Sequence, residues 1–199
     1  MGNAFSEITF TNSVKEIQDE QGSRRINARF EEGDLRNNVL GPAEVSFIEE
    51  RDSFYMATTS ETGWPYVQHR GGPAGFVRVL DEQRLGFADF RGNRQYISVG
   101  NLMKDDRISL FFMDYKNKTR LKLLGRTQFI GLEETETLDK LELPDYRARV
   151  ERGIIIRMEG FDWNCPQHIT PRFTTAEVEA LTQPLQERIE ALESELNAV

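Results

Sequence analysis

The sequence predicts a mainly β protein, a small antiparallel barrel with helices around its periphery. Three observations favour this class. β-branched and aromatic residues gather in six or seven short runs through the middle of the chain, and turn residues separate most of these runs. Helical patterns fill the two ends of the chain. Only one short helix is expected inside the first series of strands, so adjacent hairpins account for most of the sheet.

The first segment, residues 1–52, is polar and has a helical pattern. Ser13 and Glu16 have the spacing of a capping box, and Gly33 and Gly41 are stop signals. Pro42 fits the first turn of a helix that runs to about residue 51, because a helix needs no backbone N–H there. The segment is therefore expected to form a helical extension that packs on the barrel.

The predicted barrel domain covers residues 53–173 and starts with two hairpins. Gly63 marks the turn of the first, and the glycine-rich segment 71–75 separates it from the second. Asn93 is placed to cap a short helix that ends near residue 103. The expected strands are 53–59, 64–70, 76–80, 85–90, 107–115, 119–130 and 153–161.

Two further helical patterns follow. One covers residues 133–149, and the other forms the C-terminal tail, 174–199. Pro184 is expected to kink or divide the tail helix, because proline removes a backbone donor. The tail carries an apolar stripe that is expected to pack on the barrel or on a partner subunit rather than to form an independent coiled coil. The stripe consists of Val178, Leu181, Leu185, Ile189, Leu192 and Leu196.

Composition narrows the function. With 199 residues, a net charge of −8 and 38% apolar residues, the chain reads as an ordinary globular protein. A single cysteine excludes an internal disulfide, and two histidines supply a metal site poorly, so no metal is predicted. No apolar run is long enough to span a bilayer and no export signal is found, which predicts a cytoplasmic protein without membrane contact.

Charge is distributed unevenly along the chain. Residues 66–126 carry 12 Lys/Arg and 6 Asp/Glu, whereas the remainder carries 13 and 27. This balance favours a small anionic ligand over nucleic acid, which the rest of the chain would repel. An edge of alternating solvated charges remains the alternative.

The strongest local pattern is the segment 89–95, which ends a strand and is expected to open a helix. Backbone N–H groups at a helix N-terminus together with an arginine favour phosphate binding. His69, Arg70 and Arg78 on the preceding strands are expected to converge on the same point. An ordinary capped helix with solvated arginines is the competing interpretation.

Three stretches in this order resemble the pyridoxamine 5'-phosphate oxidase-like family, in its predicted flavin-nucleotide-binding branch. They are GWPY at 63–66, LGFADFRGNRQ at 85–95 and NLMKDDRISLFF at 101–112. The resemblance covers residues 47–161. It implies a six-stranded split barrel of the FMN-binding type and a homodimer in which both subunits complete each flavin site.

The resemblance also assigns roles by position. Arg94 matches the arginine that grips the FMN phosphate, and Asn93 and Gln95 flank it, Gln95 where lysine is usual. Ala88 and Asp89 correspond to the pair beside the phosphate and the ribityl chain. Arg120 stands where a glutamine often reaches the flavin ring.

The C-terminal end of the matched region departs from the true oxidase. Its substrate-holding Arg-x-His pair is missing, and only Trp163 and His168 correspond in outline. We expect residues 162–168 to lie beside the flavin ring, with Trp163 against an aromatic ring and with His168 and Cys165 as candidate catalytic residues. Cys165 has no basic neighbour in sequence, and a lone cysteine is more often a small buried apolar residue than a nucleophile.

Three functions remain open at this stage. The first is an FMN-dependent oxidoreductase that acts on a small molecule or electron donor. The second is a non-catalytic flavin carrier or sensor. The third keeps the barrel and binds haem or a deazaflavin. FMN is favoured over FAD because no G-x-G-x-x-G follows a strand to hold a pyrophosphate.

Overall fold

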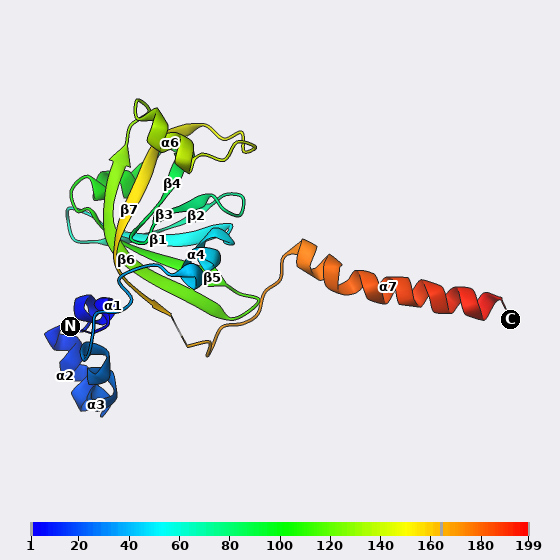
Figure 1. Cartoon of the computed structure of the whole chain (residues 1–199), viewed down its shortest axis with the longest axis horizontal. Helices are drawn as coiled ribbons and strands as arrows, with labels where there is room; N and C mark the ends of the chain where they lie inside the picture. The colour runs from blue at the N-terminus through cyan, green and yellow to red at the C-terminus, as the bar shows by residue number, and fades with distance from the viewer. Residues whose placement is uncertain (1, 164, 199) are drawn as a thin grey trace. The chain divides into compact units, whose positions relative to one another are not determined.

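The computed structural model describes residues 2–163 and 165–198, and Figure 1 shows the order of its elements. The helices are α1 (Ala4–Thr9), α2 (Asn12–Glu20), α3 (Arg24–Asn27), the 3-10 helix η1 (Ala28–Glu31), α4 (Pro42–Glu49), α5 (Ile97–Leu102), α6 (Thr135–Leu141) and α7 (Thr175–Asn197). The strands are β1 (Ser53–Thr59), β2 (Pro65–Gly71), β3 (Val77–Asp81), β4 (Arg84–Phe90), β5 (Arg107–Asp114), β6 (Thr119–Ile130) and β7 (Val150–Trp163). None of these helices is long and apolar enough to cross a membrane.

The chain divides into two compact units. The first comprises Met1–Met113 and Arg120–Cys165 and holds most of the sheet together with the helices α1 to α6. The second comprises Asp114–Thr119 and Pro166–Val199 and holds the β5–β6 turn and α7. The boundaries expected after residues 52 and 173 stay a prediction.

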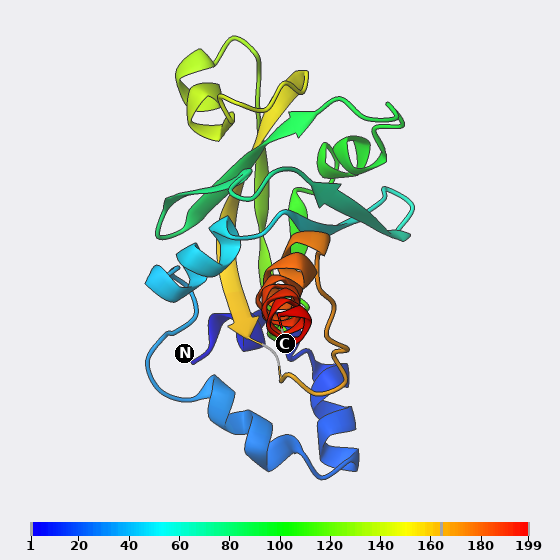
Figure 2. The ribbon, with the colours of Figure 1, turned by 90° about the vertical axis from the view of Figure 1, so that its right-hand side faces the viewer.

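The strands form one mainly antiparallel sheet in the order β2-β1-β5-β6-β7-β4-β3. The six strands implied by the family resemblance are wrong, because the described residues form seven. The seven positions expected from the residue pattern are close to those observed. β1 begins and ends at the predicted residues, and β7 extends three residues before and two after the predicted 153–161. Peripheral helices surround the sheet as expected, and α6 lies against β3, β4 and β7 at one end of it (Figures 1 and 2).

The sheet curls but does not close into a barrel. Although four strands lie between β2 and β4 in the sheet order, the Arg70 guanidinium on β2 reaches the Asp89 carboxylate on β4. The rings of Phe54 on β1 and Phe87 on β4 also meet, at 5.3 Å. Within the described residues no backbone ladder joins β2 to β3 or β4. Side-chain contacts therefore hold the two ends of the sheet together where a closed barrel would have hydrogen-bonded strands.

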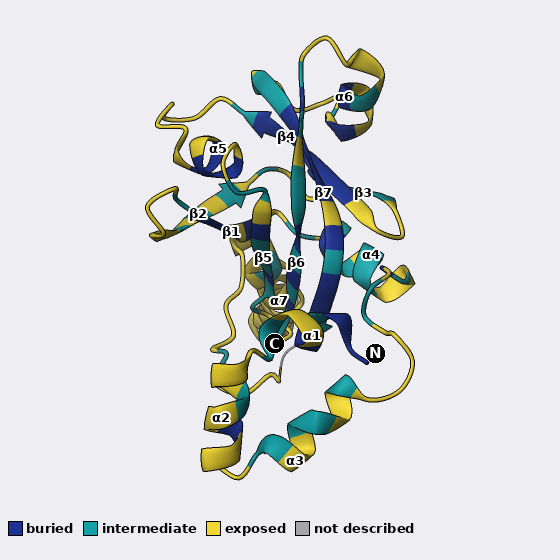
Figure 3. Cartoon of the chain, turned by 90° about the vertical axis from the view of Figure 1, so that its left-hand side faces the viewer, coloured by how far each residue is buried: buried dark blue, intermediate teal, exposed yellow. Residues whose placement is uncertain are grey.

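The core fills the inside of this curl. Phe54, Phe76, Phe87 and Phe112 are almost fully buried, and the Phe54 ring lies between 5.1 and 5.8 Å from the other three. Figure 3 shows the buried stretches along β4 and β7. Aromatic rings at these separations stabilise a core beyond the area that they bury. This packing gives the ends of β2 and β4 a rigid base.

Three local expectations are corrected. The cap of α2 is Thr11, not Ser13, because the Thr11 hydroxyl accepts from the Val14 N–H at 3.4 Å. The helix expected over 133–149 is only the seven residues of α6, and Pro144 follows shortly after its end. α7 continues through Pro184 as one helix, so Pro184 does not divide it. Pro42 occupies the first turn of α4 as predicted.

Candidate functional site

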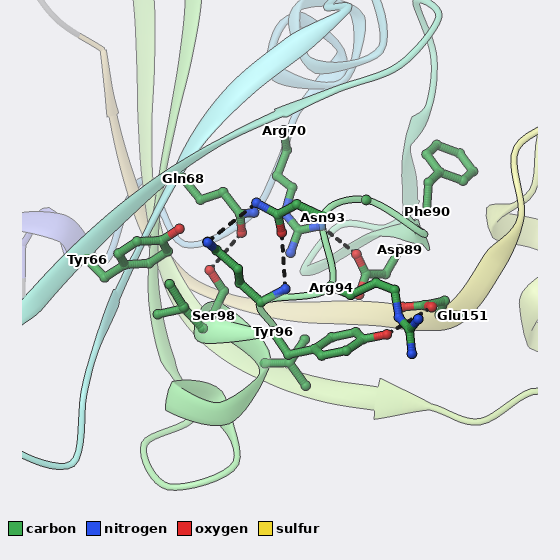
Figure 4. Close-up of a pocket in the computed structure, with 14 residues that line it drawn as sticks. Tyr66, Gln68, Arg70, Asp89, Phe90, Asn93, Arg94, Tyr96, Ser98 and Glu151 are labelled. Atoms are coloured by element: carbon green, nitrogen blue, oxygen red, sulfur yellow. Dashed lines mark hydrogen bonds and ion pairs between the residues drawn. The ribbon is translucent and has the colours of Figure 1, made fainter.

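A cavity lined mainly by polar side chains lies where β2 and the end of β4 approach each other, at the mouth of the curled sheet (Figure 4). The cavity measures about 190 Å³. Its walls come from β2, from the end of β4, from the loop 92–96, from the start of α5 and from Glu151 on β7. Segments far apart in the sequence therefore meet at one place. Five residues predicted for the site line it, namely Arg70, Asp89, Asn93, Arg94 and Gln95.

The register of β2 explains which of its side chains face the cavity. Arg70 pairs with Phe54 and Gln68 pairs with Met56, and paired residues of antiparallel strands share a face. Phe54 and Met56 are core residues, so Arg70 and Gln68 point to the inside of the curl. His69 lies between them and points to the other face, since side chains alternate along a strand.

Three charged groups form a cluster at the cavity, in which Arg70 and Asp89 line the cavity and Arg152 contacts Asp89 from outside the lining. One Arg70 Nη lies 2.5 Å from Asp89 Oδ1, and Arg152 Nε lies 3.4 Å from Asp89 Oδ2. The Arg70 and Asp89 side chains are only 15% and 6% exposed. Among the described residues, the buried Nε atoms of Arg70 and Arg152 have no hydrogen-bond partner. Two guanidiniums thus share one carboxylate, and each keeps an unsatisfied donor.

Glu151 organises the opposite wall of the cavity. Its carboxylate accepts a hydrogen bond from the Tyr96 hydroxyl at 3.0 Å (Figure 4). It also lies 3.7 Å from Arg91 Nε. The Arg152 guanidinium lies over the Tyr96 ring at 5.4 Å. A cation over an aromatic face is attracted by the quadrupole of the ring. β7 therefore holds Tyr96 by its ring and by its hydroxyl.

The loop 92–96 has an unusual backbone. Arg94 and Tyr96 adopt positive φ values of 63° and 52°, the left-handed region that non-glycine residues seldom occupy. The Asn93 side chain accepts from the Gln95 N–H at 3.1 Å and so closes a tight turn. Such strain costs about 1–3 kcal/mol for each residue and persists only where the surroundings hold it. Here the contacts of Tyr96 with β7 hold the strained backbone of the loop in place.

This backbone corrects one prediction. Asn93 was expected to cap a helix that begins directly after it, but α5 begins at Ile97 and has six residues. Left-handed residues at 94 and 96 cannot belong to a right-handed helix, so the turn delays its start. Ser98 on α5 donates to Gln68 on β2 at 2.8 Å, which ties the helix to the inner face of the sheet.

Comparison with protein families now identifies the chain. The sequence model described as pyridoxamine 5'-phosphate oxidase matches residues 40–161, more than half of the chain. The chain belongs to this family. No curated protein matches it.

Solved structures similar to the chain have low sequence identity. HupZ of Group A Streptococcus is 13% identical with a TM-score of 0.47, and the match covers 67% of this chain and 100% of that chain. An FMN-binding protein of Syntrophomonas wolfei is 11% identical with a TM-score of 0.44, covering 77% and 95%. A Clostridium acetobutylicum protein related to general stress protein 26 is 16% identical with a TM-score of 0.43, covering 67% and 92%.

Several residues that the family resemblance singled out lie away from the cavity. Ala88 is next to Asp89 but faces the other side of β4, where it packs in a second apolar cluster with Leu141. Arg78 on β3 pairs with Gly86 on β4 and does not line the cavity. Trp163 donates from its indole N–H to Glu44 at 2.8 Å and packs edge-on against Phe47, so it anchors α4.

His69 and Arg120 share the outer face of the sheet. His69 pairs with Tyr55 and their rings lie 5.6 Å apart, and Tyr55 pairs in turn with Phe111. The Arg120 guanidinium lies over the Phe111 ring at 5.5 Å. Four side chains from β2, β1, β5 and β6 thus form one row on the face that points away from the core.

The two candidate catalytic residues lie at the junction of the two units. Cys165 ends the first unit and is exposed, and His168 belongs to the second unit, is exposed and has a positive φ of 62°. The described residues contain no group of three or more His, Cys, Asp or Glu arranged to hold a metal ion.

The sequence reasoning missed several residues of the site. Tyr66 and Gln68 have the same strand parity as Arg70, so the alternation of β2 was a signal that predicted them. Tyr96, Glu151 and Arg152 had no such signal. Glu151 and Arg152 reach the site through the pairing of β7 with β4, which joins residues about sixty positions apart.

Proposed function

We propose that the protein binds FMN and that the cavity at the mouth of the sheet holds its phosphate. One observation carries the proposal: Arg70 and Arg94 both line the cavity, and the largely buried Arg70 keeps an Nε–H that has no hydrogen-bond partner among the described residues. A phosphate dianion accepts several charge-assisted hydrogen bonds and compensates such an excess of guanidinium.

Arg94 completes the set of donors that suits a phosphate. It lines the cavity and is exposed, and no ion pair to it is found among the described residues. The strained loop presents it at a fixed place, and a site that is rigid before binding loses less entropy on binding. Family membership supports the same assignment, since the family's arginine at this position grips the FMN phosphate.

The size of the cavity supports a site shared by two subunits. Small-molecule pockets usually measure roughly 300–1,000 Å³, whereas this cavity measures about 190 Å³. It has room for the phosphate and the neighbouring ribityl carbons but not for the isoalloxazine ring as well. We therefore propose that a second copy of the chain completes the flavin site, as in the family's homodimers.

We propose further that the protein is an FMN-dependent oxidoreductase. Bound flavin supplies hydride or electron transfer, and the protein contributes binding, orientation and electrostatics. Arg70 and Arg94 would hold the phosphate end, Arg152 supports Asp89 and Tyr96 behind them, and the Tyr96–Glu151 contact fixes the loop that carries Arg94. His168 and Cys165 remain the proposed substrate-side residues. The substrate and the electron donor are small molecules of unassigned identity.

A comparison of FMN with riboflavin tests the phosphate assignment. The two ligands share the ring and differ by the phosphate, so each is titrated against the wild-type protein and Arg94→Ala by quenching of flavin fluorescence. We expect Arg94→Ala to weaken FMN binding by roughly ten- to a hundredfold, since a charge-assisted hydrogen bond contributes about 1.5–3 kcal/mol. Riboflavin binding should not change. Arg25→Ala, an exposed arginine on α3, is the matched control.

Equal losses for both ligands, or none for either, would mean that Arg94 does not bind the phosphate. The purified protein should also be yellow. Tighter binding of haem or of a deazaflavin than of FMN in the same assay would favour the alternative cofactors.

Turnover is tested separately from binding. We expect the flavin-loaded protein to be reduced by NAD(P)H and reoxidised by air or an added acceptor, and we expect His168→Ala to slow these rates without loss of flavin. Cys165→Ala should leave the rates unchanged if the thiol is structural. Wild-type rates in both variants with every donor that works would favour a carrier over an enzyme.

A further inference from the structure

The helix α7 differs from the strands of the sheet in that its side chains are exposed. It is 23 residues long, and no residue of it is buried. Its start is well capped, because the Thr174 hydroxyl accepts from the Glu177 N–H at 3.3 Å and Glu177 accepts from the Thr174 N–H at 2.9 Å. Helices in water are marginally stable without tertiary packing, so a helix of this length implies a surface that covers it.

One face of α7 is an apolar stripe. Its residues recur every three or four positions, and each is between 46% and 77% exposed. From Leu185 onward the spacing is four, three, four, the a/d pattern of a coiled coil. In that pattern Ile189 and Leu196 occupy a positions, and Leu185 and Leu192 occupy d positions. A β-branched residue at a with leucine at d favours two parallel strands.

The charges beside the stripe add a second observation. Residues 175–197 contain six glutamates and one arginine, Arg188. Arg188 directly precedes Ile189 and therefore occupies a g position, and Glu193 directly follows Leu192 at an e position. In a parallel pair, g of one helix faces the e position five residues later on the other. The lone cation of α7 would thus face a glutamate of the partner helix twice, once on each side.

In place of the packing on the barrel that is one expectation from the sequence, we propose that α7 is a dimerisation helix that pairs, parallel and in register, as a coiled coil with α7 of a second copy of this chain. The five stripe residues at a and d positions then pack against their own counterparts, and Leu181 lies beside them at a g position. Arg188 of each copy faces Glu193 of the other. No residue of α7 lines the cavity, and the proposal does not depend on what the cavity binds.

An antiparallel pair fits less well. The second half of the stripe can form apolar layers in an antiparallel register. In that register Leu185 lies opposite Leu196, and Ile189 lies opposite Leu192. Val178 then has no apolar counterpart among the described residues, although it is 46% exposed. The parallel register gives Val178 a counterpart as well as the four residues of the second half, and it is therefore the one that we propose.

Disulfide trapping tests the register in the full-length protein. The native thiol is removed by Cys165→Ala, and Leu192→Cys is compared with Ser194→Cys, which lies on the opposite face of α7. A parallel pair in register brings the two residues 192 together at the Cα separation that a disulfide needs. We expect Leu192→Cys to crosslink at least tenfold faster than Ser194→Cys under mild oxidation at micromolar protein.

Equal rates for the two variants would overturn the proposal. So would crosslinking of an Ile189→Cys/Leu192→Cys protein when neither single cysteine crosslinks, because that result requires an antiparallel pair. A dimer formed through the sheet alone also predicts equal rates, so it is distinguished by the same measurement.

Charge reversal tests the orientation independently. In the Leu192→Cys background, Arg188→Glu places glutamates opposite each other and should reduce the crosslinking rate at least fivefold. Adding Glu193→Arg restores opposite charges and should restore the rate. Glu187→Arg, on the face opposite the stripe, is the control and should leave the rate unchanged. Failure of the double variant to recover would contradict the proposed pairing of Arg188 with Glu193.

Discussion

Two ion pairs of equal length occupy very different surroundings in this molecule. Arg70 and Asp89 meet at 2.5 Å in the mouth of the sheet, and Arg107 and Asp105 meet at 2.5 Å at the start of β5. The first pair is 15% and 6% exposed, whereas the second is 70% and 25% exposed. Water screens the second pair and barely reaches the first. Burial, not contact distance, therefore distinguishes an ion pair that shapes a site from one that lies on the surface.

Removing the carboxylate from each pair should give the largest contrast. Asp89→Asn leaves Arg70 and Arg152 without their shared counter-ion, and breaking a buried pair costs about 3–5 kcal/mol of unfolding free energy. Asp105→Asn should cost less than about 1 kcal/mol, as exposed pairs do. Urea unfolding of both variants at neutral pH checks the difference. If the two variants lose similar stability, the buried pair is not what holds the mouth of the sheet together.

The hydroxyl of Tyr96 gives a smaller effect at the same site. Tyr96→Phe keeps the ring under Arg152 and removes the hydrogen bond to Glu151. Hydrogen bonds to charged groups contribute about 1.5–3 kcal/mol, and partial exposure should bring this one to about 1 kcal/mol. The same urea experiment measures the loss of stability.

FMN binding separates two roles for that hydroxyl. If it positions the loop, FMN affinity should fall several-fold while riboflavin affinity is kept. Loss of stability with unchanged FMN affinity would show that the hydroxyl supports the fold and not the site.

Arg94→Gly should separate stability from binding. Glycine adopts the positive φ of this position without the steric cost that arginine incurs, so the variant should be more stable by about 0.5–1 kcal/mol despite glycine's larger unfolded-state entropy. FMN binding should weaken as in Arg94→Ala, because the guanidinium is gone. Thermal unfolding and flavin titration on the same sample check both parts. A variant less stable than the wild type would mean that the arginine side chain itself supports the loop.

The individual strands could be predicted from the sequence, but the curl that brings the two ends of the sheet together could not. The alternation of polar and apolar residues located β1 and β6 within their observed bounds, because strand patterns are local. The curl that brings Arg70 to Asp89 depends on the four strands that lie between β2 and β4, and no local pattern records it. The sequence therefore predicted a split barrel, and it did not show that side chains rather than backbone pairs would join the two ends of the sheet.

The candidate site shows the same division at the level of single residues. Arg70 and His69 are neighbours in sequence and were predicted together, yet the register of β2 against the core sends them to opposite faces. Asp89 and Ala88 separate in the same way on β4. Arg94 was identified from its motif, whereas Tyr96 and Glu151 depend on the left-handed turn and on the pairing of β7, which propensity does not reveal. The sequence therefore predicted the position of the loop 92–96, whereas the strand register determines which neighbouring side chains face the cavity beside it.

The smallest expected effect concerns the exposed pair under acid. The Arg107 side chain donates hydrogen bonds to Asp105 and lowers the pKa of that carboxyl from its ordinary 3.8 to about 2. A carboxyl with a lowered pKa in the folded state stabilises the protein above its unfolded pKa, and this contribution disappears as the pH falls through the folded value. The wild type should therefore exceed Asp105→Asn in unfolding free energy at pH 5 by less than about 1 kcal/mol. The difference should shrink between pH 4 and pH 2, and 1 M salt should reduce it at every pH, since the pair is exposed. Chemical unfolding at several pH values and two salt concentrations measures it. If the difference in unfolding free energy persists unchanged to pH 2, or does not fall in 1 M salt, the Arg107–Asp105 pair behaves like a buried ion pair. The contrast between the two regions would then be wrong.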